Sequence, residues 1–328
     1  MISYLEEILE FPGQLSFKKL RIFNLEKLRA GRVPDGIIIH GMGGSGLPSN
    51  LITKIGPPIG IKKPILAWKD YGLNPYSQVF KNPLFVFVSF SGNTEETLSG
   101  LKILLAKKSR PKIAAIASGG ELKRIAGKFG LPLVTFDPEN LTPRQALGYN
   151  YYALIKVLRS VFREIQAKDL SKKISVSSLR VAARALARQI GSRIVLIYTD
   201  SNNSHLGYIW KTNINETAKL PAFNNFFPEI YHNEITAFES HYFPFFAIFL
   251  IDLQNTNKKI VKKTKALTSL LKTRGVPSMV LALKGKNAEE KMWNSIIFSH
   301  LTSFYLGKLN KVNPKATKLI DKFKRLSK

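Results

Sequence analysis

Residues 36–46 read GIIIHGMGGSG, a short apolar run that leads directly into a glycine-rich turn. From Leu47 onward the spacing of apolar residues suits a helix. A glycine-rich turn between a strand and a helix lets backbone N–H groups approach a ligand, and the helix N-terminus adds partial positive charge. Such turns also bind dinucleotides or serve tight packing alone. The stretch therefore predicts an α/β fold with a candidate anion site at Gly44 and Ser45.

A second loop, residues 89–94, reads SFSGNT and again separates a hydrophobic strand from a helix. Its hydroxyl groups come from Ser89, Ser91 and Thr94, and they suit a phosphate that is held and released. The alternative interpretation is that Ser89 and Thr94 only cap the following helix. A nucleoside triphosphate site would also need a Walker lysine and a metal-holding acid. Two such loops at strand ends of one sheet favour a phosphate site, because open α/β folds bind ligands there.

The alternation of apolar runs and helical stretches continues along the chain and predicts mainly parallel sheets flanked by helices. In the first half we expect strands at 36–40, 64–68, 84–90, 112–117 and 133–136, with helices at 47–55, 94–105 and 121–129. In the second half we expect helices at 145–165, 179–189 and 264–273, strands at 192–198, 245–251 and 278–283, and two helices within 288–328. The predicted fold class is α/β, with domains at 1–150 and 151–328. The second domain lacks copies of the two loops, so we expect it to share architecture and not chemistry with the first.

The composition indicates a folded protein. Of its 328 residues, 45% are hydrophobic and 11% are aromatic, values far from those of disordered chains. No stretch reaches the roughly 20 apolar residues that cross a bilayer, and the longest candidate, residues 242–251, contains Pro244. Acidic residues follow Met1 where a signal peptide would carry basic ones. We expect a cytoplasmic protein that has no membrane partner.

The balance of charged residues and the lack of cysteine narrow the chemistry. With no cysteine, the chain cannot use disulfides, thiolate metal sites or cysteine nucleophiles. Fifty Lys and Arg against 22 Asp and Glu give a net charge of +28, which raises nucleic-acid binding as a hypothesis. The basic residues are spread along the chain without a helix-turn-helix, RRM or zinc-finger pattern. We expect a basic surface and no nucleic-acid partner, and the size of the charge excess has no functional explanation.

The motifs resemble the sugar-isomerase (SIS) domain and, over nearly the whole chain, the bifunctional phosphoglucose/phosphomannose isomerase family. The resemblance rests on GGSG at 43–46, SFSGNTEET at 89–97, PRQALGY at 143–149, NETAK at 215–219, HNE at 232–234 and IDKFK at 320–324. It implies two SIS-type domains and a homodimer with shared active sites, without a metal or another cofactor. The implied substrates are fructose 6-phosphate, glucose 6-phosphate and mannose 6-phosphate. One departure is Pro48, which constrains the first turn of its helix but is allowed there.

Isomerisation through an enediol needs a base, a ring opener, a cation and a phosphate anchor. The resemblance assigns the base to Glu216, whose carboxylate would move a proton between C2 and C1. The alternative is a surface glutamate paired with Lys219. His232 would open the sugar ring, because imidazole titrates near neutrality, and in the family this histidine comes from the neighbouring subunit. We expect the remaining histidines to be structural: His40, His205, His241 and His300.

Three further residues complete the predicted site. Arg144 is the candidate for the cation that stabilises the enediolate, because guanidinium stays charged. The alternative for Arg144 is a residue at a helix start after Pro143. The resemblance implies that Lys324 assists ring opening and that Thr317 marks a site with room for both epimers at C2.

The preferred hypothesis is an aldose–ketose isomerase that acts on both epimers without a metal. Two other functions stay open. Another SIS enzyme, such as an amino-sugar isomerase, would share the phosphate loops. A non-catalytic SIS sensor would bind sugar phosphate and would carry a DNA-binding domain, for which the segment before the first strand is too short.

Overall fold

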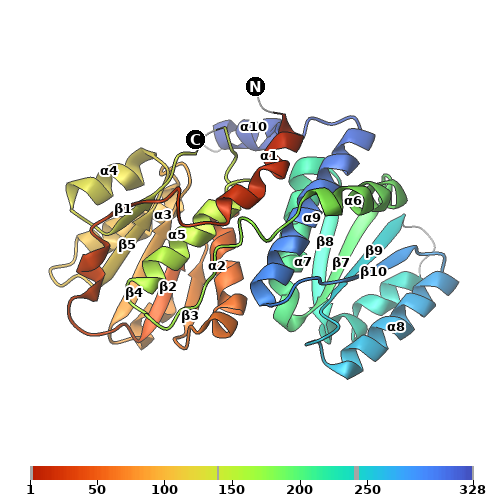
Figure 1. Cartoon of the computed structure of the whole chain (residues 1–328), viewed down its shortest axis with the longest axis horizontal. Coiled ribbons are helices and arrows are strands. Elements are labelled where there is room, and N and C mark those ends of the chain that lie inside the picture. Colours follow the sequence, from red (N-terminus) through yellow and green to blue (C-terminus); the bar gives the residue numbers. More distant parts are fainter. Residues whose placement is uncertain (1–2, 139, 240–243, 327–328) are drawn as a thin grey trace. The chain divides into compact units, whose positions relative to one another are not determined.

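The computed structural model describes residues 3–138, 140–239 and 244–326. The chain divides into two compact units, each a sheet flanked by helices (Figure 1). The first unit is Glu10–Lys173, and the second combines Met1–Leu9 with Ile174–Lys328. This division differs from the predicted boundary at residue 150, which falls inside helix α5 (Leu147–Arg159).

The first unit is built on a six-stranded sheet in the order β1-β6-β5-β4-β2-β3. Its strands are β1 Arg21–Phe23, β2 Gly36–His40, β3 Ile65–Trp68, β4 Pro83–Val88, β5 Lys112–Ile116 and β6 Leu133–Thr135. Its helices are α2 Gly43–Ile55, α3 Glu95–Leu105, α4 Gly120–Lys128 and α5, with short 3-10 turns at η1 Phe11–Gln14, η2 Leu25–Arg29, η3 Pro57–Ile59 and η4 Pro75–Val79. Neighbouring strands are parallel except for β1, which pairs antiparallel with β6. The five predicted strands are confirmed. The edge strand β1 is too short and too exposed to show a pattern in the sequence.

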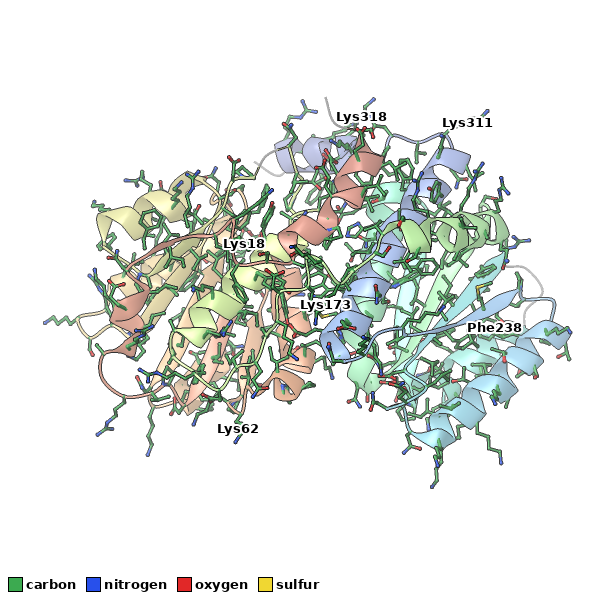
Figure 2. All side chains as sticks on the ribbon, viewed as in Figure 1. Lys18, Lys62, Lys173, Phe238, Lys311 and Lys318 are labelled. Carbon is green, nitrogen blue, oxygen red and sulfur yellow. The ribbon has the colours of Figure 1, made fainter. Side chains whose placement is uncertain are left out.

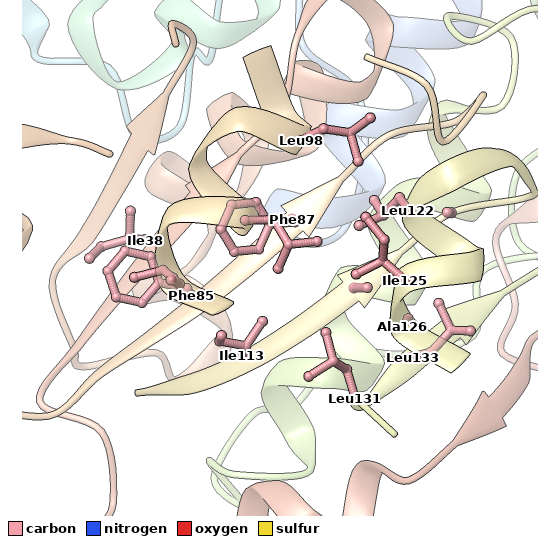
Figure 3. Packing of buried hydrophobic residues seen from close by; sticks show 14 residues of the cluster. Ile38, Phe85, Phe87, Leu98, Ile113, Leu122, Ile125, Ala126, Leu131 and Leu133 are labelled. Atoms are coloured by element: carbon pink, nitrogen blue, oxygen red, sulfur yellow. The ribbon is translucent and has the colours of Figure 1, made fainter. Parts of the chain in front are cut away.

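Alternate residues of the strands build the core of the first unit. Phe85 and Phe87 of β4 point to the same face, since side chains two apart share a face, and they pack with Ile38 against α3 and α4. Figure 3 shows this cluster, to which α4 contributes Leu122 and Ile125. Helices α2 and α5 cover the other face (Figure 1). With both faces covered, the loops at the strand ends are the places left for a ligand.

The second unit contains a four-stranded, wholly parallel sheet in the order β10-β9-β7-β8. Its strands are β7 Ile194–Asp200, β8 Ala222–Phe227, β9 Phe245–Ile251 and β10 Ser278–Ala282. Its helices are α1 Tyr4–Leu9, α6 Ser177–Ile190, α7 Ser204–Asn213, α8 Lys258–Thr273, α9 Ala288–Leu309 and α10 Lys318–Leu326, with short turns at η5 Ser201–Asn203, η6 Ile214–Ala218, η7 Glu229–Tyr231 and η8 Glu234–Glu239. The predicted strands of this half are confirmed. Strand β8 was outside the prediction because Asn224 and Asn225 interrupt its apolar residues.

The N-terminal helix α1 belongs to the second unit by its contacts. Tyr4 is buried, its hydroxyl lies 3.0 Å from Thr217 Oγ1, and its ring stacks on Phe304. The carboxylate of Glu7 forms an ion pair with Lys315. These contacts join segments about 200 and 300 positions apart, which local sequence patterns do not reveal.

The surface carries many lysines, and Figure 2 shows Lys62 and Lys311 at the outside of their units. Phe238, by contrast, is buried against the face of the second sheet that α8 covers.

Among the helices that the structure describes, none combines the length and apolar character needed to span a bilayer.

Candidate active site

The two loops that the sequence predicts to bind phosphate, residues 43–46 and 89–94, lie side by side at the carboxyl edge of the first sheet. Helix α2 begins at Gly43 directly after β2, and α3 begins at Glu95 after the neighbouring strand β4. The hydroxyl oxygen of Ser45 accepts a hydrogen bond of 2.8 Å from the backbone N–H of Phe90. This hydrogen bond joins the two loops, and the Ser45 side chain that makes it is buried. The N-termini of α2 and α3 thus open at one edge, where an anion is favoured.

The second loop is held by its own hydroxyl groups. Ser89 is fully buried, its Oγ lies 2.8 Å from Thr94 Oγ1, and it accepts a 3.0 Å bond from the N–H of Gly92. Thr94 occupies the N-cap position of α3 but makes no side-chain capping bond, so the capping interpretation is wrong for Thr94. Ser91 is exposed. Buried Ser89 and half-buried Thr94 shape this loop through their paired hydroxyl groups, while Ser91 is open to solvent.

Arg144 lies against the first loop. A Cβ atom on Gly44 would stand 2.7 Å from both the backbone N of Arg144 and the carbonyl C of Pro143, so only glycine permits this approach. Arg144 is 3% exposed and precedes the start of α5 by three positions. Loops after β2, β4 and β6 therefore meet at one edge, bringing the predicted residues Gly44, Ser45, Ser89, Ser91, Thr94 and Arg144 close together.

Lys69 is a neighbour of this edge that the sequence reasoning missed. It directly follows β3, which pairs with β2, and its Cε lies 3.2 Å from the position of a Cβ on Gly46. The side chain is half-buried, and this burial lowers the pKa of Lys69. The sequence could have indicated this position, because Lys69 directly follows the predicted strand 64–68 and so lies at the same sheet edge as the glycine-rich loop.

Glu216 lies in an unusual helical turn of the second unit. Helix α7 passes into the π-helical turn η6, and such turns occur frequently at functional sites. Glu216 is half-buried there. The ammonium of Lys219 donates to the backbone carbonyl of Glu216 and, at 2.6 Å, to that of Ala316. This bridge holds Thr317, the residue that precedes α10, beside the turn that carries Glu216.

His232 lies at the other end of the neighbouring strand. It is exposed, follows η7 and packs its ring 4.9 Å from that of Tyr231. Glu216 precedes β8, whereas His232 follows it. At about 3.3 Å per residue, the six residues of β8 separate these two ends by about 17 Å. Within one chain the structure therefore does not bring Glu216 and His232 together.

The remaining predicted residues are placed as follows. Lys324 belongs to α10, and its side chain lies outside the described part of the chain. His40 is 1% exposed, with its ring centroid 4.6 Å from that of Phe87, and burial lowers its pKa to about 4. A neutral, buried imidazole of this kind is structural. His205 and His300 are also buried, and His241 lies outside the described residues.

The carboxyl edge of the second sheet carries carboxylates where the first sheet carries its glycine- and serine-rich loops. Asp200 accepts hydrogen bonds from the backbone N–H groups of Asn202 and Asn203, at 2.9 and 3.1 Å, and one from the hydroxyl of Thr256. Asp252 forms a buried ion pair with Lys291 at 2.8 Å. The anions at this edge thus belong to the chain itself. Within the described residues, no group of three or more His, Asp or Glu side chains is gathered as a metal would require.

Comparison with known proteins identifies the relationship. The model of the bacterial phospho-glucose isomerase C-terminal SIS domain matches residues 180–326. A bifunctional phosphoglucose/phosphomannose isomerase of Caldicellulosiruptor bescii is 32% identical over 305 residues, which is 88% of each chain. The chain belongs to the bifunctional phosphoglucose/phosphomannose isomerase family. A member of this family from Thermoplasma volcanium is 28% identical over 99% of both chains.

The fold agrees with this family. A crystal structure of tagatose-6-phosphate ketose/aldose isomerase from Escherichia coli superimposes with a TM-score of 0.68 and covers 95% of this chain and 94% of that one, at 13% identity. The prediction of two SIS-type α/β domains is therefore confirmed.

Proposed function

We propose that this chain interconverts glucose 6-phosphate and mannose 6-phosphate with fructose 6-phosphate by a metal-independent enediol mechanism. The observation that carries the proposal is the convergence of the two phosphate loops and Arg144 at one sheet edge, in a chain of this isomerase family. The two aldoses differ only at C2 and reach the ketose through one enediol, so one base serves both. The proposal includes a cytoplasmic location and a place in glycolysis and gluconeogenesis.

In this proposal the first unit holds the phosphate. The free N–H groups at the start of helices favour a dianion, with Gly44, Ser45, Ser91 and Thr94 nearest to it. Ser89, which is fully buried, orders the loop around the anion. The positive charge of Lys69 adds to the field at this edge. Arg144 directs its guanidinium at the oxygens on which enediolate charge develops.

The second unit moves the protons. Glu216 takes the proton from C2 and returns it to C1, and the imidazole of His232 transfers a proton between the ring oxygen and the C1 hydroxyl. Lys324 assists ring opening, and Thr317 leaves room for either configuration at C2. The position of Thr317 beside the Glu216 turn supports this grouping.

We propose a homodimer in which His232 comes from the second copy. The support is geometric, because Glu216 and His232 stand at opposite ends of β8 in one chain. Mixing inactive Glu216→Gln and His232→Ala chains should restore about a quarter of the wild-type activity, since half of the dimers are mixed and one of their two sites is intact. As a control, mixing Glu216→Gln with Lys324→Ala should restore none. No recovery in the first mixture after confirmed subunit exchange would contradict sharing.

The central test is isomerisation of fructose 6-phosphate in the presence of a chelator, with both aldose products resolved by NMR. We expect glucose 6-phosphate and mannose 6-phosphate. Formation of neither product would refute the proposed function. If the chain converts glucosamine 6-phosphate and leaves fructose 6-phosphate unchanged, another SIS enzyme is favoured.

A further inference from the structure

The segment that carries His232 is held by contacts on both sides of that residue, while the imidazole itself is exposed. The backbone N–H of His232 donates a 3.0 Å hydrogen bond to the carbonyl of Glu229. Before it in the chain, the ring of Tyr231 lies 4.9 Å from the imidazole ring, and the ammonium of Lys263 lies 3.6 Å from the centroid of the Tyr231 ring. The backbone is thus fixed where the ring nitrogens are open to a substrate.

A second contact holds the segment two residues after His232. Glu234 is half-buried, and its carboxylate accepts a hydrogen bond from the side-chain amide of Asn225 on β8. The carboxylate also bonds to the hydroxyl of Tyr198 on β7, a residue that is 2% exposed. Burial and this neighbouring carboxylate raise the pKa of Tyr198, so the phenol keeps its proton and is the donor. We call Glu234 and its two donors the Glu234 clamp.

The sheet itself places both donors of the clamp. Tyr198 and Asn225 are partners in the parallel register of β7 and β8, so their side chains leave the same face of the sheet at neighbouring positions. The side-chain carbonyl of Asn225 accepts a 2.9 Å bond from the N–H of Phe226, which leaves its amide nitrogen to donate to Glu234. The clamp therefore ties the segment of His232 to two strands of the sheet.

We propose that Glu234 is a positioning residue that holds His232 in the geometry for ring opening. The proposal rests on the proposed function, in which His232 transfers the proton between the ring oxygen and the C1 hydroxyl. A general acid or base acts only within hydrogen-bond reach of its proton, so a shift of about 1 Å slows this step. The phosphate loops belong to the first unit, so loss of the clamp leaves phosphate binding in place.

An exchange of donor and acceptor tests the clamp by kinetics. Asn225→Asp sets a second carboxylate against Glu234 and should lower kcat for fructose 6-phosphate by about 10–100-fold, with KM within about twofold of the parent. In Asn225→Asp/Glu234→Gln the new amide donates to the new carboxylate and still accepts from Tyr198, so kcat should return to within about threefold. Glu239→Ala removes an exposed carboxylate from the same segment and should change neither constant.

Hydrogen exchange measured by mass spectrometry reports on the clamp independently of activity. In the peptide of residues 229–239, the backbone N–H groups of His232 and Thr236 make hydrogen bonds of 3.0 and 3.3 Å. Asn225→Asp should speed exchange of this peptide about tenfold, because a hydrogen bond to a charged group no longer opposes local opening. The double variant should restore the slow exchange, and Glu239→Ala should leave it unchanged.

Each outcome bears on a different part of the proposal. Unchanged exchange in the Asn225→Asp chain would overturn the clamp. Faster exchange with an unchanged kcat would overturn its role in positioning His232, as would a double variant that regains slow exchange without regaining kcat. A parent chain that leaves fructose 6-phosphate unchanged, while Asn225→Asp still speeds exchange, would keep the clamp as the anchor of this segment and refute the proposed function alone.

Discussion

The Gly44→Ala substitution tests the packing that joins the phosphate loop to Arg144. The new Cβ would lie 2.7 Å from two main-chain atoms, the N of Arg144 and the C of Pro143, whereas ordinary contact begins at 3.4 Å. Main-chain atoms cannot rotate away, so the two segments must separate by about 0.7 Å, an overpacking that costs about 1–3 kcal/mol of unfolding free energy. Ser45 follows directly and bonds to Phe90, so the strain reaches both loops.

We expect this displacement to lower kcat/KM for fructose 6-phosphate by about 10–100-fold, because misplacing a reacting group by about 1 Å can already cost about 100-fold in rate. The assay compares steady-state kinetics with denaturant unfolding of the same preparation. Gly127→Ala is the matched control, since a Cβ there meets nothing within 4 Å. Gly127 lies inside α4, where alanine should add about 0.5–1 kcal/mol of stability and leave kcat/KM unchanged.

Two results would refute this reasoning. If Gly44→Ala keeps both its stability and its kcat/KM, the close approach of the loop to Arg144 is wrong. If stability falls while kcat/KM and the inhibition by inorganic phosphate stay at wild-type values, the packing is right. The loop is then not the phosphate anchor.

Three further predictions concern single sites. Glu216→Gln should lower kcat by about 10²–10⁴-fold while titration still detects fructose 6-phosphate binding; near-normal turnover would remove Glu216 as the base. Because burial lowers the folded-state pKa of His40 from 6.5 to about 4, the unfolded chain takes up the proton first as pH falls. Between pH 7 and pH 5 the unfolding free energy of the parent chain should therefore fall by about 2 kcal/mol more than that of His40→Leu. Denaturant titrations that give both chains the same pH dependence would contradict this. Asp252→Asn leaves the Lys291 ammonium, whose side chain is 6% exposed, without its counter-charge and should cost about 3–5 kcal/mol of unfolding free energy. The double variant Asp252→Leu/Lys291→Met should lose less, and an equal loss in both would exclude the unpaired charge as the cause.

The sequence by itself determined the layered α/β architecture and the place of the two strand-end loops that we propose bind phosphate. Strands β2 and β9 have the predicted ends, because apolar runs bounded by glycine or polar residues are local signals. The convergence of the loops also followed, since the carboxyl ends of parallel strands share one edge. The roles of Glu216 and His232 came from the family resemblance and remain proposals.

Only the tertiary structure decided which distant segments meet. It assigned α1 to the second unit through Tyr4 and Thr217, placed Lys69 against Gly46, and set Glu216 and His232 at opposite ends of β8. A local period of two or 3.6 residues reports which face of an element is buried, but not which remote element covers it. Those partners follow from the packing of the whole chain, and there the main chain of Arg144 approaches Gly44 closely enough to exclude a side chain.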